Sequence, residues 1–107
     1  MNLEFDFRLY NEVLDTPLSE KELAVINNLN VDFAQRLGLV LDYCSKDRMD
    51  AHLVATAEHL QPTGIVNGGV YCAIGETMGS IAAVAASAQP AVGMSNYTDL
   101  LGSVRAG

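Results

Sequence analysis

Glu76 is an acidic residue inside a long apolar run. The run extends from Val70 to Ala88, and no other acid occurs between Glu58 and Asp99. Burying a carboxylate without partners is expensive, so a Glu in such a place is paired, protonated or retained for chemistry. We therefore take Glu76 as a candidate functional carboxylate. The alternative is that its side chain faces a water-filled gap between packed elements, or caps a neighbouring loop through hydrogen bonds.

A Gly-Gly pair lies shortly before this acid, in Asn67-Gly68-Gly69. If a helix begins here, its first backbone N–H groups are exposed at the positive end of the dipole, where an oxyanion or a polarised carbonyl can bind. A tight turn is the alternative explanation of the glycines. Eight residues span about 12 Å of helix, so Gly68 and Glu76 of one chain cannot both reach one carbonyl. If both act, they act from different chains, and the site lies between subunits.

The segment 68–87 is the predicted helix that positions both features. At roughly 100° per residue, small side chains fall on one narrow stripe. These are Gly68, Cys72, Gly75, Gly79, Ala82 and Ala86. Bulky side chains cover the far side, and a helix that is apolar nearly all round is typical of a protein core. We therefore expect a buried helix whose small stripe allows another backbone to approach closely.

Shorter elements are predicted around this helix. The capping-box pattern from Ser19 to Glu22 predicts a helix that ends near Leu29. The remaining expected elements are a short helix over 33–37 ended by Gly38, a hairpin of strands 39–44 and 48–55, a loop at 61–64, and a strand over 92–101.

The charge distribution divides the chain. Its 107 residues carry a formal net charge of −7, and eleven of the thirteen acids precede Gln61. The first sixty residues are therefore predicted to form a solvated shell, and the part from Ile65 onward to form the core. With 50% apolar residues and a mean hydropathy of +0.18, the chain is too hydrophobic for a disordered segment.

The composition also argues against two classes of binding partner, nucleic acids and membranes. No cluster of Lys or Arg is present to bind nucleic acid or an anionic membrane, and Glu76 argues against a membrane-spanning helix. Cys44 and Cys72 have no metal-ligand spacing, so we expect buried thiols, no metal site and no disulfide framework. The N-terminus lacks the layout of a signal peptide, so the cytoplasm is the expected location.

The combined motif resembles the hotdog-fold acyl-CoA thioesterases, in particular the branch that includes phenylacetate-pathway and 4-hydroxybenzoyl-CoA thioesterases. The matching residues run from His59 to Val70 (HLQPTGIVNGGV) and from Glu76 to Ser80 (ETMGS). The resemblance covers about residues 36–107. It implies an α+β hotdog domain there, with an antiparallel sheet wrapped around the 68–87 helix, and leaves 1–35 as an N-terminal helical segment.

The resemblance implies a role for each matching residue. Glu76 corresponds to the catalytic carboxylate, and Gly68 to the glycine whose N–H polarises the thioester carbonyl. Gln61 corresponds to the loop amide that places the thioester or the attacking water. Ser80 corresponds to a hydroxyl near the acyl group, and Asn67 and Gly69 belong to the substrate-binding turn. The family acts as a homodimer or homotetramer on acyl-CoA, without a metal or other cofactor.

Two departures from the family pattern bear on activity. Asn67 stands where the family usually has His, which replaces an imidazole hydrogen bond with an amide one. The chain also ends at Gly107, so the expected fold lacks the last two strands of the sheet. A non-catalytic hotdog that binds acyl-CoA and an inactive truncated fragment are therefore the alternatives to a thioesterase. A dehydratase is disfavoured, because its His-containing motif is not evident.

Several other residues have weaker claims to a role. Arg105 is a weak candidate for binding the phosphates of CoA. His52 and His59 are expected to have structural roles. Tyr71 and Cys72 are expected in core packing, with an acyl pocket as the alternative. Asp99 fits either a contact with the site across the interface or a turn at the end of a strand.

Overall fold

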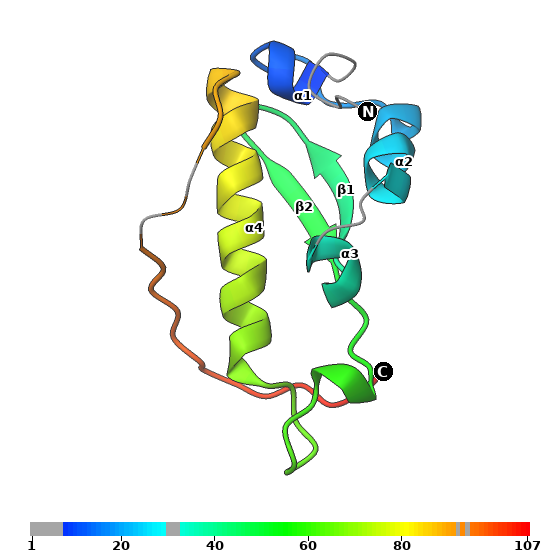
Figure 1. Ribbon diagram of the computed structural model, residues 1–107, viewed down its shortest axis with the longest axis vertical. Helices are drawn as coiled ribbons and strands as arrows, with labels where there is room; N and C mark the ends of the chain where they lie inside the picture. Colours follow the sequence, from blue (N-terminus) through cyan, green and yellow to red (C-terminus); the bar gives the residue numbers. More distant parts are fainter. Residues whose placement is uncertain (1–7, 30–32, 92, 94) are drawn as a thin grey trace.

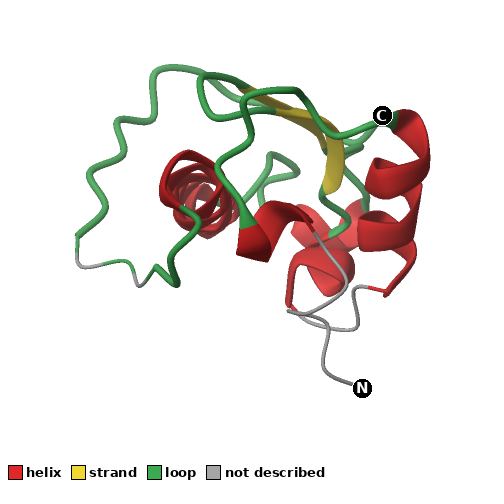
Figure 2. Cartoon of the chain, turned by 90° about the horizontal axis from the view of Figure 1, so that it is seen from above, coloured by secondary structure: helices red, strands yellow, loops and turns green. Residues whose placement is uncertain are grey.

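The computed structural model describes residues 8–29, 33–91, 93 and 95–107. Its elements, in chain order, are α1 (Arg8–Asn11), α2 (Glu20–Leu29), α3 (Phe33–Leu37), β1 (Val40–Cys44), β2 (Met49–His52), a short 3₁₀ helix (Ala57–His59) and α4 (Gly68–Ser87). The fold class is α+β, as predicted. The hairpin, α2 and α3 lie on one side of α4, and the segment after α4 runs back along its other side (Figures 1 and 2).

The predicted hairpin is present, and its second strand is shorter than expected. β1 and β2 are antiparallel, with Cys44 opposite Met49. The turn is closed by the Ser45 N–H, which donates to the Arg48 carbonyl at 2.9 Å. Regular pairing in β2 ends at His52 instead of residue 55. Among the described residues these two strands form the whole sheet.

The predicted capping box begins α2. The Glu22 N–H donates to Ser19 Oγ at 3.1 Å, and the Ser19 N–H donates to Glu22 Oε1 at 3.1 Å. The Arg8 guanidinium of α1 also reaches Glu22, at 2.9 Å and 3.0 Å. The pKa of Glu22 is lowered from 4.5 to about 2. The hydrogen bonds from Arg8 are the main cause, and the bond from the Ser19 N–H is the second. Sequence reasoning did not foresee α1, which is a single turn.

The bounds of α4 agree with the prediction. Asn67 is the N-cap, and its Oδ1 accepts from the Gly69 N–H at 2.8 Å. At the other end Ala88 adopts a left-handed conformation with φ 57°, and its N–H donates to the Val84 carbonyl at 2.8 Å. This ending reverses the chain direction. By length and composition α4 could span a membrane. Core helices of soluble proteins have the same length and composition, so this is only weak evidence for a membrane span.

The prediction that α4 is buried along its length was wrong. Only Val84 and Ala85 of this helix are buried, both near its C-terminal end. They join a cluster supplied mainly by the first part of the chain, namely Leu9, Leu14, Leu18, Leu23, Leu41 and Cys44. The backbone of Leu14 links the parts of this cluster, because it donates to the Ala85 carbonyl and accepts from the Lys46 N–H, both at 2.9 Å.

The predicted division into acidic shell and apolar core was therefore also wrong. Among the described residues, eight of the eleven buried hydrophobic side chains precede residue 61. The leucines of the short N-terminal elements point inward while their acids face solvent, which is ordinary for amphipathic segments. Burial at Cys44 raises the pKa of its thiol, whereas Cys72 is exposed, contrary to expectation.

The strand expected over residues 92–101 is absent from the described part of that range, which is 93 and 95–101. A strand needs a partner for its ladder of hydrogen bonds, and in the described part of the chain β1 and β2 pair only with each other. The segment instead follows α4 at the surface, where Tyr97 and Leu101 are 101% and 95% exposed. Positions 92 and 94 lie outside the described residues.

Candidate functional site

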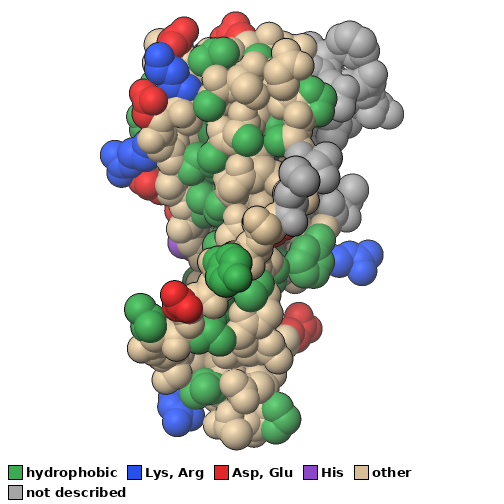
Figure 3. All heavy atoms as spheres, turned by 90° about the vertical axis from the view of Figure 1, so that its left-hand side faces the viewer, with side chains coloured by type: hydrophobic (Ala, Val, Ile, Leu, Met, Phe, Trp, Pro, Cys, Tyr) green, Lys and Arg blue, Asp and Glu red, His purple; other side chains and the backbone are tan. Residues whose placement is uncertain are grey.

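An open cleft of about 710 Å³ lies between α4 and the segment that returns along it. One wall consists of α4 side chains from Tyr71 to Ala83. The other wall consists of described residues between Ala91 and Asp99. Figure 3 shows this face of the molecule, where hydrophobic side chains lie along its length and charged ones lie mostly toward its margins.

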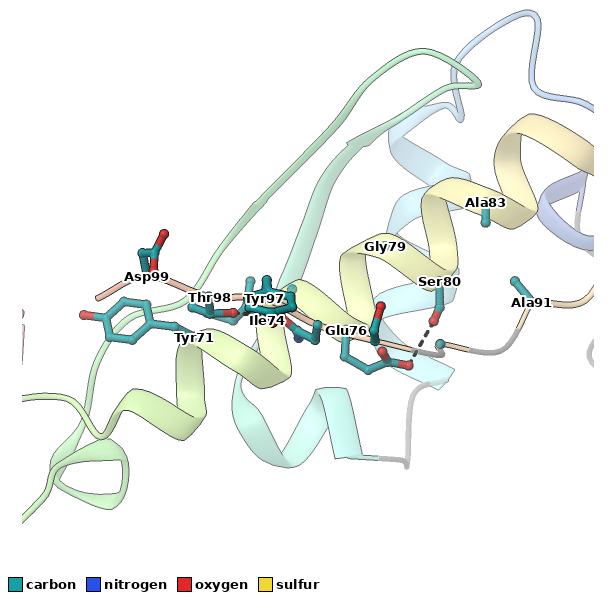
Figure 4. Close-up of a pocket in the computed structure, with 14 residues that line it drawn as sticks. Tyr71, Ile74, Glu76, Gly79, Ser80, Ala83, Ala91, Tyr97, Thr98 and Asp99 are labelled. Carbon is teal, nitrogen blue, oxygen red and sulfur yellow. Dashed lines mark hydrogen bonds between the residues drawn. The ribbon is translucent and has the colours of Figure 1, made fainter. Parts of the chain in front are cut away.

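Glu76 lies in the middle of this cleft (Figure 4). Its side chain is exposed, and Ser80, one turn later, donates a hydrogen bond from Oγ to Glu76 Oε1 at 3.3 Å. No ion pair to Glu76 occurs among the described residues, and no Lys, Arg or His lines the cleft. The carboxylate is thus open to a ligand and to water, and is not neutralised by a cation.

The wall opposite Glu76 approaches it very closely at Gly93. A Cβ at this position would collide with both carboxylate oxygens of Glu76. Farther along, Asn96 Nδ2 donates to the Cys72 carbonyl at 2.8 Å, and Asn96 Oδ1 accepts from Thr98 Oγ1 at 2.7 Å. The amide lies against Gly75, where a Cβ would be in ordinary van der Waals contact with it. Asn96 therefore holds the wall against α4, a role that sequence reasoning missed.

The two ends of the cleft differ in polarity. Toward the start of α4 it is lined by the hydroxyl and carboxyl groups of Tyr71, Thr98 and Asp99. Toward the end of α4 it is lined by Ala83 and Ala91, and Glu76 lies between the two ends (Figure 4). A bound molecule with one polar and one apolar end therefore has a preferred orientation.

The N-terminus of α4 lies outside this cleft. The Gly69 N–H is engaged by Asn67 Oδ1, and the Leu100 side chain packs over Gly68. Among the described residues no hydrogen bond to the Gly68 N–H is present. Gly68 and Glu76 lie eight residues apart on one helix, about 12 Å along its axis. One chain therefore does not bring the predicted oxyanion donor to the predicted carboxylate.

The Gln61 loop also lies apart from Glu76. The Gln61 N–H donates to the Ile65 carbonyl at 2.8 Å, and its carbonyl accepts from the Gly64 N–H at 2.9 Å. Gln61 does not line the cleft. Arg105 Nη1 lies 3.2 Å from the place of a Cβ on Gly64, so this cation is beside the same loop. Of the predicted site residues, the structure brings Ser80 to Glu76, while Asn67, Gly68 and Gly69 lie together at the start of α4, away from the carboxylate.

The two histidines have structural partners. His59 Nδ1 accepts from the Thr56 N–H at 2.9 Å, so its other nitrogen carries the proton and donates to the Leu37 carbonyl at 2.5 Å. On the hairpin, His52 Nδ1 lies 2.7 Å from Asp42 Oδ2. The described residues contain no group of three His, Cys, Asp or Glu side chains suited to a metal ion.

Comparison with known proteins gives four relatives, including the two that follow. Proteins from two strains of Mycobacterium tuberculosis, each named "Putative esterase", are 38% identical to this chain over 85 residues. The alignment covers 75% of this chain and 61% of each relative, so the chain spans about three fifths of their length. No protein-family model matches the sequence, and no solved structure matches the chain. The chain is thus similar to esterase-like proteins at the level of sequence.

Proposed function

We propose that this chain belongs to a hydrolase of acyl thioesters with a hotdog fold and with Glu76 as its catalytic carboxylate. The observation that carries the proposal is a carboxylate that has no cationic partner among the described residues, is bonded to Ser80 and lies in the middle of a cleft large enough for a small ligand. The relatives' name supports ester hydrolysis in general. The choice of a thioester rests on the motif around Gly68 and Glu76.

The proposed reaction needs water and one carboxylate. Glu76 removes a proton from water while the water oxygen attacks the thioester carbonyl carbon. The resulting oxyanion is stabilised by the Gly68 N–H of a second chain. The C–S bond then breaks, and the proton held by Glu76 goes to the departing sulfur, giving a carboxylic acid and a thiol. In the nucleophilic variant, a carboxylate oxygen of Glu76 attacks the carbonyl carbon, the C–S bond breaks, and a mixed anhydride forms while the thiolate leaves; water then hydrolyses the anhydride and supplies the proton of the thiol.

Glu76→Gln tests the carboxylate. This variant keeps the shape of the side chain and removes its basicity, so we expect thiol release from acyl thioesters to fall by about 10²- to 10⁴-fold. Glu58→Gln is the matched control, since it removes an exposed acid outside the cleft and should leave the rate unchanged. Equal rates for wild type and Glu76→Gln would refute the proposed role. Matching oxygen esters in the same assay would show which class is preferred.

A mixing experiment tests the placement between subunits. Gly68→Pro removes one N–H at the first position of α4, where the backbone accepts proline because Asn67 before it is already extended, and the ring displaces only the end of the exposed Leu100 side chain. Gly68→Pro and Glu76→Gln should each be inactive alone. In an equal mixture, half of the dimers are mixed and one of their two sites is intact, so about a quarter of the wild-type rate should return. Failure to regain activity, with mixed dimers demonstrated by mass, would exclude the shared site.

A non-catalytic binding protein is the second candidate. It is favoured by the N-terminus of α4, where Asn67 occupies the Gly69 N–H and Leu100 covers Gly68. If this arrangement persists in the assembly, no oxyanion donor faces a ligand. Binding would then raise the melting temperature in the presence of a thioester while no thiol is released.

The remaining expectations belong to the same proposal. The substrate is an acyl-CoA, with coenzyme A entering only as part of the substrate and with no metal or redox cofactor. The assembly is a homodimer or homotetramer in the cytoplasm, without a nucleic-acid or membrane partner. Intact mass and size-exclusion chromatography of natively expressed protein test the assembly directly.

A further inference from the structure

A second hollow of about 220 Å³ lies between α1 and the C-terminal half of α4. Its lining is mostly apolar and includes Leu9 and Tyr10 from α1, and Ile81 and Val84 from α4. Among the described residues, no charged side chain lines it. We call it the α1 pocket.

The α1 pocket adjoins the Glu76 cleft. Ser80 and Ala91 line both hollows, so these two side chains form the boundary between them. Ser80 is also the hydrogen-bond donor to Glu76. On α4, Glu76, Ser80 and Val84 follow one another at intervals of four residues, so they lie in one row along the helix. A ligand that follows this row passes from the carboxylate to the α1 pocket.

The polarity of the cleft sets the direction of such a ligand. The polar end, with Tyr71 and Asp99, suits the hydrophilic leaving group of an ester or thioester. The apolar end, with Ala83 and Ala91, leads toward the α1 pocket. A carbonyl at Glu76 then directs its acyl chain toward Val84 and its leaving group toward the start of α4.

We propose that the α1 pocket binds the apolar tail of the acyl group, with Tyr10 as a chain-length determinant. This inference rests on the proposed hydrolase function. The path from Glu76 to Val84 is about 12 Å, which an extended chain covers in roughly ten bonds. The favoured substrates are therefore unbranched, uncharged acyl chains of about eight to twelve carbons.

A chain-length series tests the inference. The substrates are N-acetylcysteamine thioesters with acyl chains from acetyl to tetradecanoyl, used below their micelle-forming concentrations. For the wild type we expect kcat/KM to rise about two- to fourfold for each methylene that enters the pocket, and to level off near twelve carbons. A profile that is flat, or highest for acetyl, would overturn the assignment.

Two variants at Tyr10 locate the effect. Tyr10→Ala removes the ring that lines the pocket and should lower kcat/KM for decanoyl thioester by about five- to tenfold, while the acetyl rate stays within twofold. Tyr10→Phe keeps the ring and should keep the wild-type profile. Val13→Ala is the matched control, because Val13 and Tyr10 are similarly exposed, at 38% and 42%, and Val13 does not line the pocket. Equal losses on acetyl and decanoyl substrates in Tyr10→Ala would contradict the inference.

A binding measurement separates this inference from the proposed function. The probe is 1-octanol, followed by calorimetry and by thermal unfolding of the wild type and Tyr10→Ala. Octanol binding that Tyr10→Ala weakens, together with no hydrolysis of any thioester, would support the pocket and refute the hydrolase. Hydrolysis that Glu76→Gln abolishes, together with octanol binding that Tyr10→Ala leaves unchanged, would refute the pocket alone.

Discussion

The two ends of α4 lie in different surroundings. The C-terminal end is fixed in a leucine cluster, where Leu14 and Ala85 are completely buried. The stretch from Tyr71 to Ala83 faces a cleft whose opposite wall has no regular structure in its described residues and exposes Tyr97 almost fully. The helix is therefore anchored at its C-terminal end and available along the stretch before it. Stability and the proposed chemistry depend on different parts of one element, so substitutions should separate them.

The largest effect is expected at the anchored end. Leu14→Ala removes a fully buried side chain and leaves a cavity, so the free energy of unfolding should fall by about 3–5 kcal/mol. Its neighbour Val13 is 38% exposed, and Val13→Ala should change stability by less than about 0.5 kcal/mol. Urea unfolding measures both values. Similar losses for the two variants would mean that the leucine cluster does not anchor the helix.

In the cleft, Gly93→Ala should lower activity without lowering the free energy of unfolding. A methyl group here meets the end of the flexible Glu76 side chain, which can turn away at little cost. The displaced carboxylate loses its position against a substrate, so we expect about a tenfold fall in kcat. Gly102→Ala is the control, since nothing lies within 4 Å of that position. Unchanged kcat in Gly93→Ala would show that the position of the carboxylate against this wall is unimportant.

The ion pair between Arg8 of α1 and Glu22 of α2 should make the free energy of unfolding depend on pH in the acid range. The pKa of Glu22 is lowered from 4.5 to about 2 in the folded chain, so its contribution is present above about pH 4.5 and is lost as pH falls toward 2. Because Glu22 is 35% exposed, we expect only about 1 kcal/mol. Comparing urea unfolding of wild type and Glu22→Gln at about pH 6 and about pH 2 measures it. A difference that grows on acidification would contradict the ion pair.

The smallest expected change is a gain. Gly79 lies within α4 on the side of the cleft, and a Cβ there has nothing within 4 Å. Gly79→Ala should therefore stabilise the fold by about 0.5–1 kcal/mol through helix propensity. Thermal unfolding measures the gain. If the melting temperature falls instead, this part of the helix carries a packing constraint that the present geometry does not include.

Local signals in the sequence were sufficient for several elements. The capping residues Ser19 and Glu22, the positive φ of Gly38 and the polar link at 45–47 act within a few residues, and the elements they predicted are present. The bounds of α4 were predicted from the apolar run that follows the glycines, and the cap at Asn67 was found only in the structure. Capping and turns depend on near neighbours, which the sequence displays directly.

Burial could not be predicted in this way. Hydrophobicity along α4 indicates a preference for burial, but the described elements cover mainly its C-terminal end. The expected strand over 92–101 failed for a related reason, since strand composition does not supply a pairing partner. In the site, the pairing of Glu76 with Ser80 follows from their spacing of four residues. Asn96 had no such signal, because its partner, the Cys72 carbonyl, is remote in sequence. The roles of Gln61 and Gly68 stay predictions.

The left-handed Ala88 at the end of α4 makes the cleft sensitive to chain length. It turns the chain back antiparallel to the helix, so a carboxylate and the glycine that faces it come from one continuous stretch of sequence. One residue inserted or deleted between Ala88 and Ala91 would slide that wall by about 3.3 Å, the rise of one extended residue. Gly93 would then no longer face Glu76. This short connection is accordingly a place where indels should be poorly tolerated, although it lies on the surface.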